Sequence, residues 1–380
     1  MRQGLKNLVI RFTACAALSI VAVPGFALQD VLESKAMTTE KAPSSLLLDV
    51  VKAGNRLVAV GERGHIIFSD NQGKTWRQAS VPVSVTLTAV HFPSQTQGWA
   101  VGHGAVILHS ADAGETWEKQ FDGNVANEVV IGAAQRNVAA LEKALDSASD
   151  DKKSKLEAAL DEANFALDDA KADSEAGASK PLLDVWFKND KEGFVVGAYG
   201  FFFSTKDGGS TWENAAPRIA NPDRFHLNAM NQVTGGAVFI AGEAGVLFRS
   251  VDGGENWVTL ESPYEGSLFG VAGNGNVNEV TIYGLRGHLF RSVDMGDSWS
   301  GVDSGTESSL MGSFASSDGS MYVVGNSGTI LVSGNAGESF KSRVREDRVS
   351  LMSGIMLEDD SLILVGENGV VIADSQGRSK

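Results

Sequence analysis

The chain repeats one stretch of sequence, whose fullest copy reads Gly284-Leu-Arg-Gly-His-Leu-Phe-Arg-Ser-Val-Asp-Met-Gly-Asp-Ser-Trp299. The shared pattern is Gly-x-x-Gly, four mostly apolar residues, and then Ser-x-Asp-x-Gly-x-[Thr/Ser/Asn]-Trp. Copies begin at Gly61, Gly102, Gly197, Gly242, Gly284 and Gly325, and a degenerate copy begins at Gly366. Neighbouring copies are about 40–46 residues apart, except for one interval about twice as long. Such a period is typical of the blades of a β-propeller.

Short runs of β-branched and aromatic residues flank each Gly-x-x-Gly, for example residues 56–60 and 65–68. These runs are bounded by glycines and read as strands. A further strand precedes each pair, as at residues 46–50, and a fourth begins at each tryptophan. The sequence therefore predicts an all-β fold, a seven-bladed β-propeller of four-stranded blades. Blades 1 and 2 are expected in residues 46–123 and blades 3 to 7 in residues 180–380.

The Ser-x-Asp-x-Gly element is predicted to be the hairpin between the third and fourth strands. Asp and Ser side chains can accept hydrogen bonds from nearby backbone N–H groups, and Gly permits a left-handed turn. We interpret these residues as structural rather than as catalytic carboxylates or calcium ligands: Asn71, Trp76, Asp112, Trp117, Asp207, Trp212, Asp252, Trp257, Asp294 and Trp299. In the third copy the serine position is assigned to Ser204. Asn71 and Asn335 replace the aspartate, and Phe340 replaces the tryptophan.

Hairpins such as Ser110-Ala-Asp-Ala-Gly-Glu-Thr-Trp117 and Ser250-Val-Asp-Gly-Gly-Glu-Asn-Trp257 resemble Asp-boxes, the BNR repeats of sialidases and other propellers. Residues 44–123 and 180–378 together resemble more closely the photosystem II stability/assembly factor family of seven-bladed propellers. The resemblance implies a non-enzymatic protein that helps a membrane protein complex to assemble or stay stable. In photosynthetic members that client is the photosystem II reaction centre. Because nothing in the sequence indicates a photosynthetic host, we expect another bacterial membrane complex, for example an exporter.

Residues 1–27 read as a secretory signal peptide, cut after Ala27. Basic residues precede an apolar run of about 12 residues, which is too short to span a bilayer. Cys15 is the only cysteine, so the mature chain would have neither disulfides nor thiol chemistry. We therefore expect an exported, periplasmic protein without direct membrane insertion after cleavage. An uncleaved anchor is the alternative.

The mature chain is strongly acidic. Three of the 32 basic residues lie in the signal peptide, whereas all 47 acidic residues follow it. This balance argues against a nucleic-acid partner.

Residues 28–45 precede the first blade strand, and the last repeat ends before its own fourth strand. Since an open sheet edge invites aggregation, we predict that residues 30–35 or their neighbours supply the missing outer strand of the seventh blade. A disordered leader is the alternative.

The insertion at residues 124–179 differs in composition from the repeats. Apolar residues recur at helical spacing in two stripes, separated by a break at residues 147–151: Val138, Leu141, Ala144 and Leu145, then Leu156, Leu160, Ala163 and Leu167. The pattern predicts an antiparallel α-helical hairpin between blades 2 and 3, with a narrow coiled-coil seam. It is interpreted either as an arm that grips a partner or as a passive decoration.

Strand connectivity places this arm on the same face as the Gly-x-x-Gly loops and opposite the Asp-box hairpins. Varied polar and aromatic tips on a rigid scaffold suit recognition, so we predict a protein-binding surface at this face. The candidate binding residues are Arg63, His65, His103, Tyr199, Glu243, Arg286, His288, Asn326 and Glu367.

The alternative function is a sialidase-like glycosyl hydrolase or a glycan-binding BNR-repeat module. A sialidase needs an arginine cluster and a tyrosine nucleophile beside a glutamate, and no such constellation is recognisable. The histidines lack metal-ligand spacing, and no phosphate-binding loop occurs. We therefore predict no enzymatic activity, no catalytic residues, no metal and no cofactor.

Overall fold

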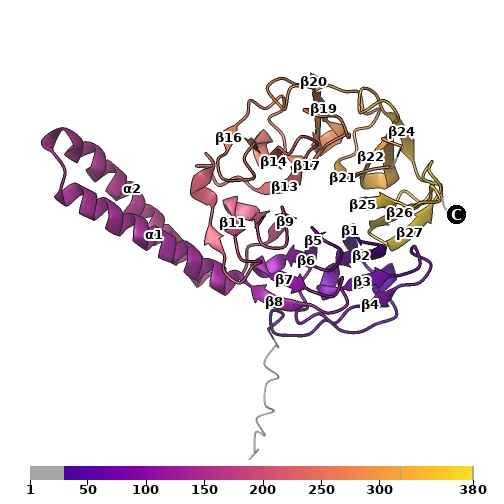
Figure 1. The fold of residues 1–380 in the computed structure, drawn as a ribbon, viewed down its shortest axis with the longest axis horizontal. Coiled ribbons are helices and arrows are strands. Elements are labelled where there is room, and N and C mark those ends of the chain that lie inside the picture. Colours follow the sequence, from indigo (N-terminus) through magenta and orange to yellow (C-terminus); the bar gives the residue numbers. More distant parts are fainter. Residues whose placement is uncertain (1–29, 317, 379–380) are drawn as a thin grey trace, which may run out of the picture.

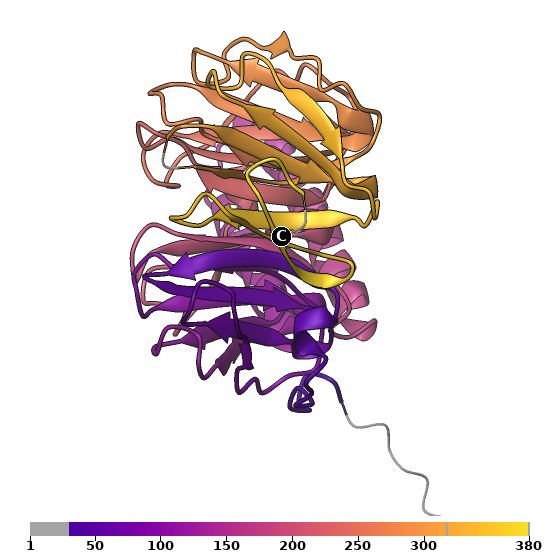
Figure 2. The same cartoon turned by 90° about the vertical axis from the view of Figure 1, so that its right-hand side faces the viewer.

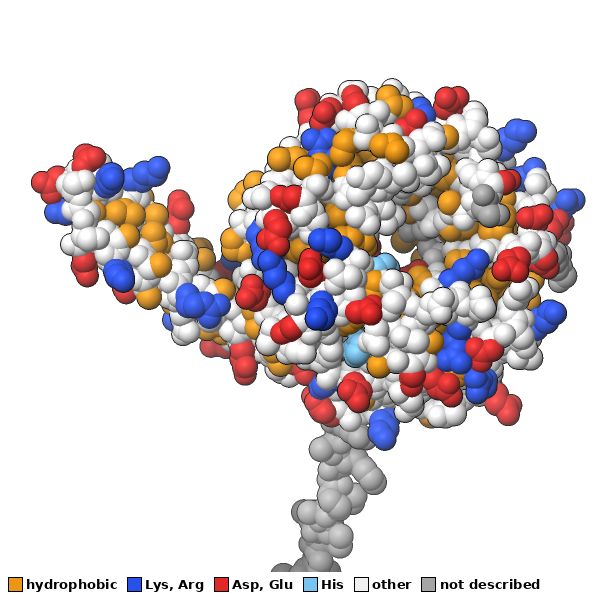
Figure 3. Space-filling model, viewed as in Figure 1, with side chains coloured by type: hydrophobic (Ala, Val, Ile, Leu, Met, Phe, Trp, Pro, Cys, Tyr) orange, Lys and Arg blue, Asp and Glu red, His pale blue; other side chains and the backbone are white. Residues whose placement is uncertain are grey.

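The computed structural model describes residues 30–316 and 318–378, which form seven antiparallel sheets around a central opening (Figures 1 and 3). Six of these sheets have four strands and one has three. Each sheet runs from an inner strand at the opening to an outer strand at the rim. The predicted seven-bladed propeller with an inserted helical hairpin is confirmed, with a seventh blade one strand short. The predicted signal peptide lies outside the described residues.

Within each blade the strands run in chain order from the inner strand to the outer strand. Blades 1 and 2 consist of β1 (Leu47–Ala53), β2 (Arg56–Gly61), β3 (Ile66–Ser69) and β4 (Arg77–Gln78), then β5 (Leu87–His91), β6 (Gly98–Gly102), β7 (Ile107–Ser110) and β8 (Glu118–Phe121). Blades 3 and 4 consist of β9 (Leu182–Phe187), β10 (Gly193–Gly197), β11 (Phe202–Thr205) and β12 (Glu213–Asn214), then β13 (Leu227–Gln232), β14 (Val238–Gly242), β15 (Leu247–Ser250) and β16 (Val258–Thr259). Blades 5 and 6 consist of β17 (Leu268–Ala272), β18 (Val280–Gly284), β19 (Leu289–Ser292) and β20 (Ser300–Gly301), then β21 (Leu310–Ala315), β22 (Met321–Gly325), β23 (Thr329–Ser333) and β24 (Lys341–Val344). Blade 7 consists of β25 (Leu351–Met356), β26 (Leu362–Gly366) and β27 (Gly369–Ala373).

The core lies between neighbouring blades. Val58 and Phe68 of blade 1 pack with Val90 and Leu108 of blade 2 in one buried cluster. The hairpin tryptophan of blade 2, Trp117, completes this cluster and is only 4% exposed. The Asp-box tryptophan thus joins its own blade to the preceding one, which explains why the repeat keeps a large aromatic residue at this position.

Polar side chains also join the inner strands of neighbouring blades. Asp49 on β1 accepts hydrogen bonds from the N–H of Val90 at 3.0 Å and from the Ser353 hydroxyl of blade 7 at 2.8 Å. Asp184 on β9 similarly accepts from the N–H of Met230 at 2.7 Å. Burial raises the pKa of Asp184 to about 7. The Asp49–Ser353 bond links the first blade to the last and so helps to close the ring.

The predicted ring-closing strand at residues 30–35 is wrong, because residues 30–45 contain no strand and β27 pairs only with β26. These residues form instead an N-terminal strap across the loop ends of blades 2, 1 and 7. Leu32 is 5% exposed in the core between blades 1 and 2, and Ala36 N–H donates to the Val81 carbonyl at 3.1 Å. The strap ends in a 3-10 turn, η1 (Ala42–Ser44), whose Ala42 is buried between blades 7 and 1. Burial of Leu32 near blade 2 holds residues 30–35 away from the seventh blade.

The insertion forms two helices, α1 (Gly123–Asp146) and α2 (Asp150–Glu175), so the predicted hairpin is confirmed. Asp122 caps α1 by accepting from the N–H groups of Asn124 and Val125. The seam residues named from the sequence are half-buried, apart from Ala163, which is buried. Figure 1 shows that this arm projects outward from the rim of the ring, and in Figure 2 it lies largely behind the blades. No helix within residues 30–316 and 318–378 is both long and apolar enough to span a bilayer.

Candidate protein-binding site at the base of the helical arm

The Gly-x-x-Gly segments form tight 3-10 turns between the second and third strands. These turns are η2 (Glu62–Gly64), η3 (His103–Ala105), η4 (Ala198–Gly200), η6 (Glu243–Gly245), η7 (Leu285–Gly287) and η8 (Asn326–Gly328). Glycine is required at the first position, because a Cβ atom on Gly61 would lie 2.0 Å from the Leu46 carbonyl oxygen. The tip residue is left-handed, with φ of 55° at Arg63, 56° at Tyr199 and 57° at Arg286. A left-handed non-glycine residue costs about 1 kcal/mol or more, so the surrounding turn must hold these tips in place.

The arm begins and ends at these turns. A Cβ atom on Gly123, the first residue of α1, would lie 2.6 Å from Ala178 Cα and 3.0 Å from the Gly104 carbonyl oxygen of η3. The arm, the tight turns and the N-terminal strap therefore share one face of the ring, which we call the loop face. The antiparallel strand order puts the Asp-box hairpins on the opposite face.

The structure places eight of the nine predicted binding residues at the surface of the loop face. Arg63, His103, Tyr199, Arg286, His288 and Glu367 are exposed, while Glu243 and Asn326 are half-buried. His65 is different, being only 3% exposed. The chain has already turned back into β3 at this residue, and burial lowers the pKa of the imidazole. His65 cannot contact a partner directly, so this assignment is corrected.

The remaining tips are distributed over the blades, and only those of blades 3 and 4 meet in one cluster. Tyr199 contacts His226 edge to face, with ring centroids 5.0 Å apart. Glu243 accepts a hydrogen bond from the backbone N–H of His226 at 3.1 Å. In blade 5, His288 lies against Tyr264 at 4.2 Å between ring centroids. Of these groups, Tyr199 lies beside the base of the arm, where it lines the cavity described next.

A cavity of about 520 Å³ separates the arm from blade 3, and we call it the arm-base pocket. Small and apolar side chains dominate its walls. Its lining includes Val130 and Ala134 of α1, Ala170 of α2, and Phe201, Pro217 and Ile219 of blade 3. A largely apolar pocket with a few polar groups at its rim is the usual form of a binding site.

Three ion pairs, made by two cations, hold the arm against the ring at this pocket. Arg224 Nη1 lies 2.6 Å from Asp169 Oδ2 of α2 and 3.8 Å from Asp173 Oδ2. Lys180 also pairs with Asp173, and its Nζ lies 5.5 Å from the ring centroid of Tyr199. Because each cation faces an arm carboxylate, the pocket rim is electrically balanced. It therefore favours apolar or aromatic side chains over a free ion.

The arm also exposes one aromatic side chain. Phe165 of α2 is 77% exposed, although it is the only aromatic residue of the insertion. Aromatic residues, phenylalanine included, are enriched at protein interfaces relative to the rest of the surface. Phe165 lies outside the apolar stripe of α2 that forms the helical seam. An aromatic residue at such a position is expected to be exposed, so the sequence alone could have identified it. Lys180, Arg224 and His226 carried no such signal, because only the folded ring brings them together.

On the opposite face the Asp-box residues close their own hairpins. Asp112 accepts hydrogen bonds from the Ser110 hydroxyl at 2.8 Å and from Thr116 N–H at 2.9 Å. Hydrogen bonds from the backbone and side chain of Asn256 lower the pKa of Asp252 to about 2. The carboxylates of these boxes are thus hydrogen-bonded within their own turns.

One assignment in the third box changes. Thr205, not Ser204, donates to Asp207 Oδ1 at 2.9 Å and accepts from the Gly209 N–H. A threonine hydroxyl serves as well as serine at this position. Within residues 30–316 and 318–378 no group of three or more His, Cys, Asp or Glu side chains could hold a metal ion.

A family model described as "Photosynthesis system II assembly factor YCF48" matches residues 33–178 and 170–320. "Photosystem II assembly lipoprotein Ycf48" of Synechococcus sp. (strain CC9902) is 36% identical over 78 residues, which are 20% of this chain and 23% of the relative. "Photosystem II stability/assembly factor HCF136, chloroplastic" of Arabidopsis thaliana is 33% identical over 93 residues, or 23% of each chain. These alignments span less than a quarter of either relative.

Solved propellers share the whole fold. The structure "YCF48 bound to D1 peptide" has a TM-score of 0.60 at 12% identity, covering 89% of this chain and 98% of that one. "YCF48 from Cyanidioschyzon merolae" has a TM-score of 0.59 at 13% identity, covering 90% and 98%. The WD40 propeller domain of Doa1 also reaches 0.59, at 11% identity, with coverage of 90% and 95%. At these identities the likeness concerns the fold alone.

Proposed function

This chain belongs to the photosystem II assembly factor family, and from that premise we propose that it is an exported, non-enzymatic scaffold that binds a membrane protein complex during its assembly. The arm-base pocket is the observation that carries the proposal. It joins an apolar cavity, the exposed tip of Tyr199 and a projecting arm on one face of a rigid ring. A recess of this kind suits an extended or helical segment of a protein partner.

The family relatives support a protein partner. One solved relative is titled "YCF48 bound to D1 peptide", so a propeller of this fold can hold a peptide. For this chain the client is photosystem II in a photosynthetic host, or another membrane complex such as an exporter elsewhere. The protein acts from the periplasm, associated with the membrane through its partner. Phe165 and Tyr199 are the residues we assign to the first contact.

Site-specific photo-crosslinking in the native host tests this proposal. A benzoyl-phenylalanine residue replaces Tyr199 in one variant and Phe165 in another, and the adducts in the membrane fraction are identified by mass spectrometry. Both variants should give an adduct with the same integral membrane protein.

The matched control is Val251, which is 69% exposed in the Asp-box hairpin of blade 4 on the opposite face. The same probe at Val251 should not label that protein. Equal labelling from Val251, or adducts with soluble proteins alone, would reject the loop face as the membrane-complex surface.

A further inference from the structure

The two helices of the arm form one wall of the arm-base pocket. This wall consists of Val130 and Ala134 of α1 together with Ala166 and Ala170 of α2. Ala163 continues the α2 side toward the tip of the arm, because residues three apart on a helix share a face. Figure 3 shows hydrophobic side chains exposed farther along the arm. The pocket is thus the inner end of an apolar groove between the helices, which we call the arm groove.

The arm by itself leaves this groove uncovered. Leu141 of α1 and Leu156 of α2 belong to the seam and remain half-buried, and Ala166 is exposed. Phe201 and Ile219 of blade 3 add apolar walls on the ring side of the pocket. A helix placed in the groove would pack on both arm helices at the usual interaxial distance of about 8–10 Å. It would convert the hairpin into a three-helix bundle.

A helix suits the groove better than an extended segment does. The sheet edge at the pocket is β12, the outer strand of blade 3, which is two residues long and contacts α1. An extended segment would therefore find few main-chain partners there. A helix satisfies its own backbone hydrogen bonds and needs only a groove for its apolar face.

The α2 side of the groove is acidic. Residues 157–175 carry seven acidic side chains and one lysine. Glu162, Asp169 and Asp173 lie on the same side of α2 as Ala166, because spacings of four and seven residues return to one face. Asp169 and Asp173 are paired at the base of the arm, whereas the exposed Glu162 makes no ion pair with any residue of 30–316 or 318–378. A segment with basic side chains beside its apolar face complements this wall.

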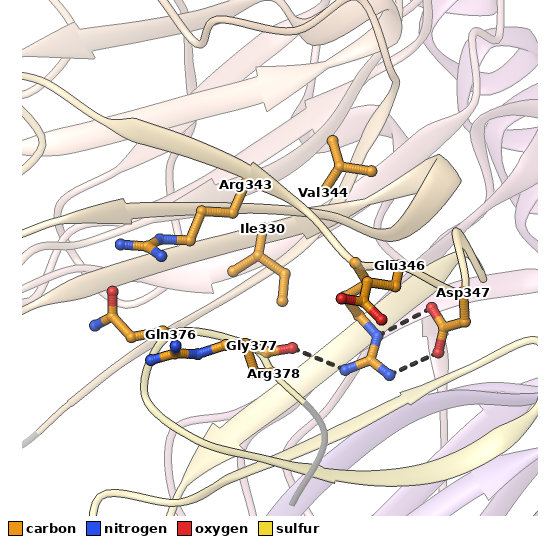
Figure 4. Close-up of a pocket in the computed structure, with 9 residues that line it drawn as sticks. Ile330, Arg343, Val344, Glu346, Asp347, Gln376, Gly377 and Arg378 are labelled. Atoms are coloured by element: carbon orange, nitrogen blue, oxygen red, sulfur yellow. Dashed lines mark hydrogen bonds and ion pairs between the residues drawn. The ribbon is translucent and has the colours of Figure 1, made fainter.

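A cavity of about 620 Å³ beside blade 6 has the opposite character (Figure 4). Three arginines line it, Arg343, Arg345 and Arg378, against the two carboxylates of Glu346 and Asp347. Arg345 Nη2 lies 2.6 Å from Asp347 Oδ2, so one of these charges is already paired. A basic segment would meet net positive charge in this cavity, which makes the arm groove the better site for it.

A second copy of the arm fits the groove poorly. It would bring the acidic side of its own α2 against an acidic wall, and like charges in contact disfavour association. The tip between the two helices, residues 147–149, is Ser-Ala-Ser, which offers no large apolar side chain to fill the arm-base pocket.

We propose that the arm groove binds a basic amphipathic helix of the partner protein. Large apolar side chains of that helix enter the groove, and the innermost one fills the arm-base pocket beside Tyr199. Its basic side chains lie along the acidic side of α2 at Glu162. This inference rests on the proposed function and describes the chemistry of the partner that the function requires. The binding mode is a helix in a groove, with anchors one helical turn apart.

A synthetic helix is the probe. The fluorescein-labelled peptide Lys-Ala-Leu-Lys-Lys-Leu-Trp-Lys-Ala-Leu-Lys-Lys-Leu-Leu-Lys-Ala-Leu-Lys places leucine and tryptophan on one helical face and lysine on the other. The full chain should bind it saturably in fluorescence anisotropy at physiological salt, with a Kd of about 100 μM or less. Helical signal in far-ultraviolet circular dichroism should exceed the sum of the separate components. A peptide with glutamate at every lysine position should bind at least about tenfold more weakly, because it meets the acidic side of α2.

Matched substitutions on α2 locate the binding site. Ala166→Arg puts a bulky cation into the arm groove and should weaken binding at least about tenfold. Ala172→Arg makes the same change on another face of the helix and should alter binding less than about twofold. Glu162→Lys should weaken binding about threefold or more, whereas Glu157→Lys, also on another face, should leave it unchanged. All four positions are exposed, so each variant should keep the helical signal of the arm.

Several results would overturn the inference. They are absence of binding at about 1 mM peptide, equal effects of Ala166→Arg and Ala172→Arg, and equal binding of the lysine and glutamate peptides. Sedimentation showing that the arm groove pairs with a second copy of the chain would also overturn it. The proposed function is tested separately: membrane-protein adducts at Tyr199 and Phe165 without peptide binding would reject the basic helix alone. Peptide binding without such adducts would reject the membrane-complex partner and leave the specificity of the groove established.

Discussion

At the scale of single residues, hydrogen-bond geometry rather than charge closes the Asp-box turns. Asp112 accepts from Ser110, Glu115 and Thr116. In blade 1, Asn71 makes the equivalent hydrogen bonds. Its Oδ1 accepts from Thr75 N–H at 2.9 Å, and its Nδ2 donates to the Thr75 hydroxyl at 2.8 Å. An amide is therefore an adequate substitute for the carboxylate.

If an amide can replace the carboxylate, two substitutions of Asp112 should differ in their effect on stability. Asp112→Ala should lower the free energy of unfolding by about 1–3 kcal/mol, because it leaves turn donors unsatisfied. Asp112→Asn should cost less than about 1 kcal/mol, because the amide retains the acceptor. Urea unfolding followed by tryptophan fluorescence measures both. Equal losses in the two variants would show that the negative charge, and not the geometry, is essential.

The raised pKa of Asp184 predicts that the free energy of unfolding depends on pH. Its folded-state pKa of about 7 lies above the ordinary value of 3.8, so the folded protein binds the proton more tightly. Its stabilising contribution is complete below about pH 4 and is lost as the pH rises through 7. Asp184→Asn, which has no titrating group, should flatten the dependence of the unfolding free energy on pH between about 4 and 7.5. Identical slopes for the variant and the natural protein would contradict this assignment.

At the scale of elements, the N-terminal strap is anchored by one buried side chain. Leu32 is 5% exposed, whereas Met37 in the same strap is 66% exposed. Leu32→Ala should lower the free energy of unfolding by about 2 kcal/mol or more, through lost burial and the cavity that remains. Met37→Ala, the matched control, should change it by less than about 0.5 kcal/mol. Similar melting temperatures for both variants would mean that the strap detaches without affecting the ring.

The elements differ in how well the sequence predicts them. The hairpins and the helical seam are readable because their contacts lie within a few residues or one helical turn. The strap is wrongly predicted as a strand because the partner of Leu32 is a cleft between two blades, and no local pattern encodes that cleft. The prediction for His65 fails because exposure at this position depends on packing in the folded ring: His288 occupies the same place after its own turn and is exposed. The arm-base pocket could not be predicted at all, since Lys180 and Asp173 meet only after the arm has folded back.

At the scale of the whole molecule, the ring is independent of the outer half of the arm. The inner part is integrated, since Ala126 is fully buried with the core of blades 2 and 3. Beyond it, Val138 and Leu160 belong to the hairpin seam and to none of the blade cores. The arm therefore resembles a projection from the ring more than one of its supports.

Truncation of the arm tests this independence. Replacement of residues 138–160 by Gly-Ser-Gly should remove helical signal in far-ultraviolet circular dichroism and leave the melting temperature within about 3 °C, because little ring surface is exposed. A variant of equal length with a scrambled surface on residues 138–160 serves as the control. A drop in melting temperature of more than about 10 °C would show that the outer arm stabilises the blades.

The burial of Leu32 against Gly104 also fixes where the described chain enters the ring. Residue 30 meets the propeller on the same side as Tyr199 and the root of the helices. A partner that holds the chain at residue 30 would consequently also face Tyr199 and the root of the helices.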